Sequence, residues 1–137
     1  MSTNADALNH ALAAFNEGDI DRYLDLYDDH VQVHGYTPAP LDKAGARAFY
    51  QGILTGLPDS TLEALDRIET DDTIVVRFVQ RGTHRGELLG VPATGRPVEL
   101  HGITILRFGD EARVVERWSQ ADLLGLLVQV GAIPPPG

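Results

Sequence analysis

Candidate acid–base residues gather in the last third of the chain, where His101 and Asp122 stand near each other in sequence. Burial raises the pKa of an aspartate, whereas a neighbouring imidazolium lowers it again. A carboxylate balanced in this way can remove a proton alpha to a carbonyl while the imidazole stabilises the enolate oxygen. We therefore predict Asp122 as the base and His101 as its partner. The open alternative is that Asp122 only caps a helix that begins at Leu123.

Strand parity predicts which side chains accompany this pair, because residues two apart on a strand share a face. In the predicted strand 97–108, His101 and Ile103 share a face that we expect to line a cavity. A tight turn after this strand would pair residues whose numbers sum to about 221. Trp118 would then lie opposite Ile103, and Gln120 opposite His101.

Further ligand contacts are predicted from a second strand, a helix and two histidines. His34 ends the first strand and faces either the cavity mouth or solvent. His84 ends its own strand and bonds either the following loop or a ligand. The predicted substrate-binding residues are His34, Tyr50, Phe78, Gln80, His84, Ile103, Trp118 and Gln120.

Composition excludes several classes of function. The chain has no cysteine, which removes thiolate chemistry, and its histidines lack the HxH or HExxH spacing of a metal site, so we expect no metal. A net charge of −9, with 11 scattered Lys and Arg residues, argues against nucleic acid as a partner. No apolar run reaches the roughly 20 residues of a membrane span, and the N-terminus does not resemble a signal peptide. We therefore expect a cytoplasmic protein that does not bind membranes.

Hydrophobic periodicity predicts helices in the first half and strands in the second. The first helix starts at Ser2 or Thr3 and stops at Gly18. A second is capped by Asp19 and carries Ile20, Tyr23, Leu24 and Tyr27 on one side, and a third is capped by Asp42. A short strand at 31–35 separates the last two. The later elements are strands at 60–69, 73–84, 97–108 and 112–121, followed by a terminal helix that starts at Leu123.

Helices followed by a run of antiparallel strands predict an α+β fold with segregated layers. A strongly twisted sheet that wraps the helices would be cone-shaped and would leave an apolar pocket open at one end. We expect one domain over residues 1–131 and a mobile, proline-rich tail over residues 132–137.

Two segments carry a resemblance to a known family. GTHRGELLGVPATGRPVELHGITILRF with RVVERWSQADLLGLL, and earlier AFNEGDIDRYLDLYDDHVQVHG, are similar to the SnoaL-like polyketide cyclases. The resemblance implies a nuclear-transport-factor-2-like fold, in which a curved antiparallel sheet surrounds a pocket roofed by helices. It also implies a homodimer or higher homo-oligomer built on the outer face of the sheet.

The resemblance further implies cofactor-free acid–base catalysis, such as aldol-type ring closure, on a small hydrophobic carbonyl compound. Asp122 and His101 match the family's catalytic aspartate and histidine on the WSQAD and ELHG segments. The alternative is a non-catalytic module of the same fold that binds a small molecule or serves assembly. Less favoured are an epoxide hydrolase, because no strand holds its Arg-x-Asp pair, and a ketosteroid isomerase, because a second buried acid is missing.

Overall fold

The computed structural model describes residues 3–136, which form four α-helices and five strands. Each helix begins with a side chain that accepts a hydrogen bond from the backbone N–H three residues later, namely Thr3, Asp19, Asp42 and Asp122. Ser2 lies outside the described residues. The elements in chain order are α1 (Asn4–Asn16), α2 (Ile20–Leu24), β1 (Tyr27–His34), α3 (Lys43–Gly56), β2 (Thr61–Glu69), β3 (Thr73–Thr83), β4 (Pro97–Phe108), β5 (Val114–Ala121) and α4 (Leu123–Gln129).

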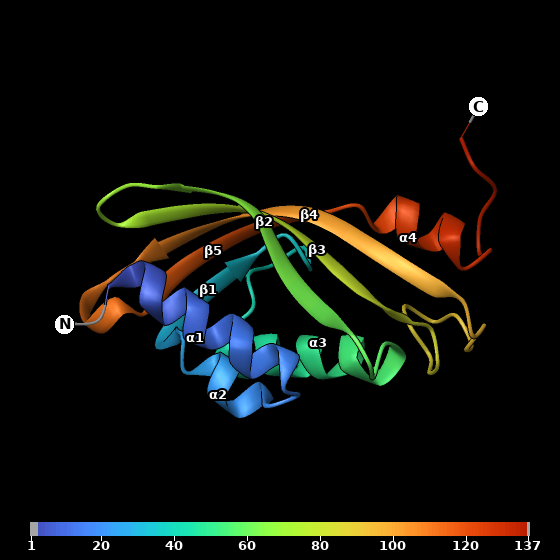
Figure 1. The fold of residues 1–137 in the computed structure, drawn as a ribbon, viewed down its shortest axis with the longest axis horizontal. Helices are drawn as coiled ribbons and strands as arrows, with labels where there is room; N and C mark the ends of the chain where they lie inside the picture. Colours follow the sequence, from blue (N-terminus) through green and yellow to red (C-terminus); the bar gives the residue numbers. More distant parts are fainter. Residues whose placement is uncertain (1–2, 137) are drawn as a thin grey trace.

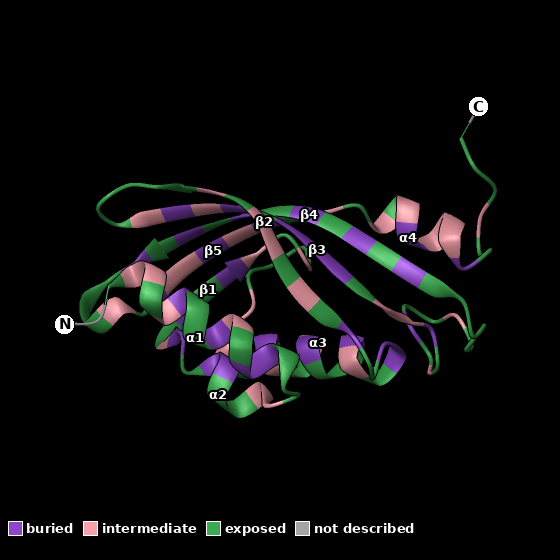
Figure 2. Cartoon of the chain, viewed as in Figure 1, coloured by how far each residue is buried: buried purple, intermediate pink, exposed green. Residues whose placement is uncertain are grey.

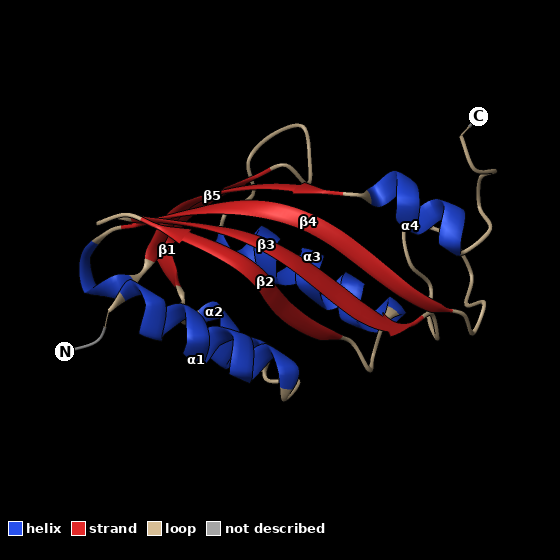
Figure 3. Ribbon diagram, turned by 45° about the horizontal axis from the view of Figure 1, so that its top comes forward, coloured by secondary structure: helices blue, strands red, loops and turns tan. Residues whose placement is uncertain are grey.

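The strands make one curved sheet in the order β1-β5-β4-β3-β2. β1 runs parallel to β5 and the other neighbours are antiparallel. Figure 1 shows the sheet arching over α1, α2 and α3, with α4 beyond the end of β5. Figure 3 shows these three helices on the same side of the sheet, so its other face is left without a helical cover. The α+β prediction, with a curved sheet around N-terminal helices, is confirmed.

Exposed and buried residues alternate along β4 (Figure 2), because successive side chains point to the outer and the concave face of the sheet. The even-numbered residues, such as Leu100 and Leu106, are buried against the helices, whereas His101 and Ile103 are exposed. The prediction that His101 and Ile103 face the cavity is therefore wrong. The odd-numbered set also contains Glu99 and Arg107, and charged side chains of this kind are mostly found in contact with water.

Two local predictions also differ from the structure. Tyr27, expected on the second helix, opens β1, because α2 ends at Leu24. β4 and β5 pair two residues away from the expected register, with Ile103 opposite Gln120 rather than Trp118. The reason is the connection between them, a 3-10 turn at Asp110–Ala112 and a bulge before Phe108, which uses more residues than a tight hairpin.

Gly35 allows the end of β1 to lie against β5. Its φ of 107° lies in the region that glycine favours, and a Cβ at this position would lie 2.0 Å from the carbonyl oxygen of Ser119. The Cβ is fixed directly to the backbone and the oxygen belongs to the backbone of Ser119, so no side-chain rotation can relieve the overlap. Tyr36 directly follows Gly35, so this close approach fixes the position of the Tyr36 backbone.

We expect Gly35→Ala to destabilise the fold by roughly 3 kcal/mol or more, because it combines backbone strain with a backbone clash. Gly18→Ala is the matched control, since Gly18 has a φ of 79° but no atom near its missing Cβ. It should cost only about 1 kcal/mol, the strain term alone. Urea unfolding of both variants measures the difference, and equal losses would contradict the role of the β1–β5 contact.

Candidate functional site

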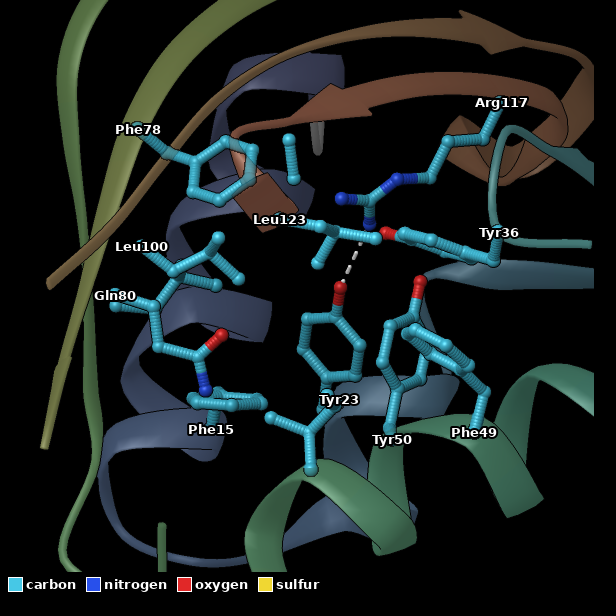
Figure 4. Close-up of a pocket in the computed structure, with 13 residues that line it drawn as sticks. Phe15, Tyr23, Tyr36, Phe49, Tyr50, Phe78, Gln80, Leu100, Arg117 and Leu123 are labelled. Carbon is cyan, nitrogen blue, oxygen red and sulfur yellow. Dashed lines mark hydrogen bonds between the residues drawn. The ribbon is translucent and has the colours of Figure 1, made fainter. Parts of the chain in front are cut away.

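A pocket lies between the concave face of the sheet and the helices, with an empty volume of ≈ 550 Å³ that includes open solvent at its mouth. Its walls are mostly apolar, with six aromatic rings and only two side chains, Gln80 and Arg117, that bring nitrogen. Figure 4 shows the rings around the guanidinium of Arg117. The lining residues are Phe15, Tyr23, Tyr36, Phe49, Tyr50, Ile53, Leu62, Phe78, Gln80, Leu100, Arg117, Ala121 and Leu123.

Arg117 is the charged group of this pocket. It lies on β5 opposite Leu106 of β4, faces inward, and is only 7% exposed. Its Nε donates to Ser119 Oγ at 2.9 Å, and its Nη1 donates to the hydroxyls of Tyr23, at 2.9 Å, and Tyr27. No salt bridge to a carboxylate is formed by Arg117 within residues 3–136. The protein therefore surrounds a buried cation with neutral oxygens.

All four tyrosines of the chain surround Arg117, and we call them the tyrosine cluster: Tyr23, Tyr27, Tyr36 and Tyr50. They come from α2, β1, the loop after β1, and α3. The hydroxyl of Tyr27 is hydrogen-bonded to those of Tyr23, at 3.0 Å, and Tyr50, at 2.8 Å. Tyr36 donates to Ser119 Oγ at 3.2 Å and stacks on Phe49. The cluster joins three N-terminal elements and the loop after β1 to β5.

Burial and the cluster determine which groups are charged. Burial works against the charge of Arg117, but the tyrosine oxygens outweigh it and raise the pKa of the guanidinium. Arginine keeps its charge in proteins in any case. Burial also raises the pKa of Tyr27 and Tyr50 well above the usual value, against the opposing pull of Arg117. At neutral pH the site therefore holds the cation of Arg117 beside the neutral phenols of Tyr27 and Tyr50, an arrangement suited to stabilising an oxyanion.

The structure places three of the predicted contacts, Tyr50, Phe78 and Gln80, in the pocket wall. Gln80 donates from Nε2 to Ser60 Oγ at 3.1 Å, which orients its amide. Phe78 fills space left by Gly102, where a Cβ would lie 2.6 Å from the ring.

His101, Ile103, Gln120 and Asp122 lie together, but in a shallow hollow on the outer face of the sheet. These residues do converge as expected, but outside the pocket, because β4 presents the odd-numbered His101 and Ile103 to the outer face. The carboxylate of Asp122 is exposed and accepts a hydrogen bond from Gly125 N at 2.8 Å, which caps α4.

The remaining three predicted contacts also lie outside the pocket walls. His34 is hydrogen-bonded through Nε2 to Glu116 at 2.7 Å and stacks on Trp118. Trp118 in turn lies under the guanidinium of Arg107. His84 is buried, and its ring bonds Thr94 Oγ1 and the carbonyl of Val91, so it holds the loop between β3 and β4.

Sequence reasoning missed Arg117 and most of the tyrosine cluster. The missed lining residues that carry polar groups are Arg117, Tyr23 and Tyr36. Parity contained a usable signal, since Glu99 and Arg107 mark the odd positions of β4 as solvent-facing. Trp118, two residues beyond Glu116 on β5, then shares their face, and Arg117 points inward.

The described residues contain neither a candidate metal cluster nor a helix that could span a membrane. Within residues 3–136, no group of three or more His, Asp or Glu side chains is placed to hold a metal ion. No helix in the same range is long and apolar enough to cross a membrane.

Comparisons with known proteins give one family. A family model described as SnoaL-like polyketide cyclase matches residues 5–130. No curated protein sequence matches the chain significantly.

Solved structures from three streptomycetes are similar over nearly the whole chain. IdmH from Streptomyces antibioticus, for which a polyketide cyclase function has been suggested, is 32% identical with a TM-score of 0.82, over 95% of this chain and 99% of that chain. AclR from Streptomyces galilaeus, for which a hydroxylase function has been suggested, is 27% identical with a TM-score of 0.88, over 98% and 84%. TsrD from Streptomyces laurentii is 29% identical with a TM-score of 0.83, over 94% and 95%.

The raised pKa values of Tyr27 and Tyr50 predict a loss of stability in alkali. Below about pH 10 both the folded and the unfolded chain keep these phenols protonated, and stability is full. Above about pH 10 the unfolded chain loses the protons first, so the free energy of unfolding falls, by up to about 1.4 kcal/mol per pH unit for each tyrosine.

Urea unfolding between pH 7 and pH 11 measures this fall, with tyrosinate absorbance as a second readout. Tyr50→Phe should reduce the slope above pH 10 by roughly half, because one of the two titrating phenols is gone. A wild-type stability that does not change up to pH 11 would contradict the buried, neutral state of the cluster.

Proposed function

The chain belongs to the SnoaL-like polyketide cyclase family, and from that premise we propose that it binds a small hydrophobic carbonyl compound and catalyses its enolisation or aldol-type ring closure. The observation that carries the proposal is a single buried cation, Arg117, at the wall of a pocket lined mainly by aromatic and aliphatic side chains. Apolar walls suit the carbon skeleton of such a compound, and the cation suits the oxygen at which negative charge develops.

In this proposal Arg117 stabilises the enolate. Loss of an alpha proton moves negative charge onto the carbonyl oxygen, and a guanidinium within about 4 to 6 Å lowers the pKa of such an acid by about 1 to 3 units. The enolate carbon then attacks a second carbonyl of the same molecule, one carbon–carbon bond forms, and the resulting alkoxide takes up a proton. Neutral phenols of the tyrosine cluster hold the guanidinium in place and supply further hydrogen-bond donors.

The described walls of the pocket supply no side chain that could accept the first proton. No carboxylate and no imidazole is found among its described lining residues. We therefore assign the proton to water at the mouth, and favour substrates whose reacting hydrogen lies between a carbonyl group and a second unsaturated group, either another carbonyl or an aromatic ring. The half-buried lining residues Tyr36, Phe49 and Leu123 mark that mouth. Asp122 and His101 remain the sequence-based alternative, which the same experiment tests.

The lack of a base in the walls also supports a second candidate, a non-catalytic module that only binds the compound. The carboxylates on which epoxide hydrolases and ketosteroid isomerases depend are missing from the same described walls, which weighs against both.

Deuterium exchange at the alpha carbon of β-tetralone, a two-ring ketone, distinguishes catalysis from binding. We expect the wild type to exchange the proton faster than buffer alone, and Arg117→Gln to lose tenfold or more of the catalysed rate. Nuclear magnetic resonance follows the loss of the proton signal directly.

Arg107→Gln is the matched control, because it removes an arginine from the outer face of the neighbouring strand, and its rate should not change. Exchange that depends on Asp122→Asn but not on Arg117→Gln would transfer the reaction to the outer hollow. Binding of β-tetralone without exchange would favour the binding module.

We also propose that two copies of the chain associate through the outer face of the sheet. This face carries Ile103, which is 50% exposed, beside Ile105 and without a helical cover. Residues of both charges flank Ile103 and Ile105, and they are paired with each other, as in Arg77–Asp66 and Arg81–Glu99. A face of mixed, internally paired charge can meet its own copy without repulsion although the whole chain carries −9, so a second copy is the occupant that fits.

If so, Ile103→Glu should convert a dimer into a monomer at micromolar concentration, because it places two like charges at the two-fold interface. Leu124→Glu is the control, since Leu124 is similarly exposed, at 54%, but lies on α4. Sedimentation velocity measures both variants. A wild type that sediments as a monomer, or an equal effect of both substitutions, would refute this interface.

A further inference from the structure

We infer that the ligand of the pocket is an organic anion, a flat unsaturated acid whose carboxylate or acidic enol oxygen pairs with Arg117. The inference rests on the pocket function proposed above and goes further by fixing the charge of the molecule that enters. A carbonyl compound that is neutral before reaction would leave Arg117 without a counter-charge in the bound ground state.

The guanidinium presents an unused donor to the pocket. Its Nε and Nη1 donate to Ser119, Tyr23 and Tyr27, whereas Nη2 has no hydrogen-bond partner among the described residues. Within the same residues, no fully enclosed side-chain nitrogen or oxygen lacks a partner. Nη2 is therefore not sealed in protein, and Arg117 is part of the wall of the pocket (Figure 4).

The charge of Arg117 is also unbalanced, in contrast to arginines at the surface. Arg77 and Arg81 are half-exposed and pair with carboxylates, although water would solvate them adequately. Arg117 is buried, where an unpaired charge is most costly, and has only neutral oxygens around it. A buried cation of this kind is stabilised by an anion that enters with the ligand.

The neighbouring phenols do not supply that anion. Burial raises the pKa of Tyr27 and Tyr50, so both are protonated at neutral pH. Arg117 also lines a second cavity, whose described walls add Thr104 and aliphatic residues but no carboxylate. The balancing charge must therefore come from outside the protein.

The walls define the rest of the ligand. Six aromatic rings line the pocket, and the space between its walls is narrow. Aromatic side chains stack on flat, unsaturated molecules, which fit a narrow slot better than branched aliphatic ones. One or two conjugated rings with an acidic oxygen at one end match both the slot and the cation.

The experiment compares two probes of equal shape, β-naphthoate and its neutral amide β-naphthamide, by titration calorimetry at pH 7. We expect the wild type to bind naphthoate about ten- to a hundredfold more tightly, the range typical of a hydrogen bond to a charged group. Equal affinities, or no detectable binding of naphthoate, would overturn the inference.

Variants locate the preference. Arg117→Gln should bring the two affinities together, Arg117→Lys should retain a preference for naphthoate, and Arg107→Gln should leave the ratio unchanged. Persistence of the full preference in Arg117→Gln would overturn the inference. If Arg117→Gln does not fold, the two affinities of the wild type are measured again in about 1 M salt. At that concentration charges at the surface are screened beyond about 3 Å, whereas a buried ion pair is screened much less. A preference for naphthoate that is lost in this salt comes from surface charges and would overturn the inference.

The inferred anion site and the proposed enzyme function can fail independently of each other. Exchange of β-tetralone without a preference for naphthoate would leave the proposed function standing and remove this inference. A strong preference for naphthoate without exchange would keep the anion site and favour the binding module over the enzyme.

Discussion

The burial of one positive charge, that of Arg117, is the interaction on which the rest of the structure depends. A guanidinium removed from water needs oxygen atoms around it, and here Ser119, Tyr23 and Tyr27 provide them, while Tyr36 and Tyr50 bond to these residues in turn. Because these tyrosines come from α2, β1, the loop after β1 and α3, solvating the charge also holds the helical layer and the edge strand against β5. The polar network of the pocket is thus a tertiary support of the fold as well as a site.

Curvature of the sheet makes room for this arrangement. Glycines permit it where strands or rings approach most closely, since Gly35 brings the end of β1 onto β5 and Gly102 leaves space for Phe78. The helices cover only the concave face of the sheet (Figure 3), so the pocket lies between the two layers, with walls from both. A cavity that is not filled by side chains persists because its walls are fixed by hydrogen bonds rather than by packing alone.

The sequence predicts the elements well and the site poorly, for different physical reasons. Helix starts at Asp19, Asp42 and Asp122 follow from local capping chemistry, and strand limits follow from local turn residues, so both can be read from short segments. The inward face of β4 is harder to predict, because Ile103 is as apolar as Leu100, and only the charges of Glu99 and Arg107 near the two ends of the strand separate the two sets. Convergence of four tyrosines on Arg117 depends on tertiary contacts between residues up to 94 apart, which no local pattern contains.

A cation in an otherwise neutral pocket serves binding or catalysis according to when the ligand acquires its charge. Only interactions that are stronger in the transition state than in the ground state increase kcat. If a carboxylate already pairs with Arg117 in the resting complex, the guanidinium contributes to affinity and to orientation, and the enolate oxygen must find its donors among the phenols. If the ligand instead carries an acidic dicarbonyl group, its enolate is the anion that Arg117 selects. Selection of the ionised form then places the reactive carbon in the pocket already activated, which explains how a pocket whose described walls hold no base can belong to a family of cyclases.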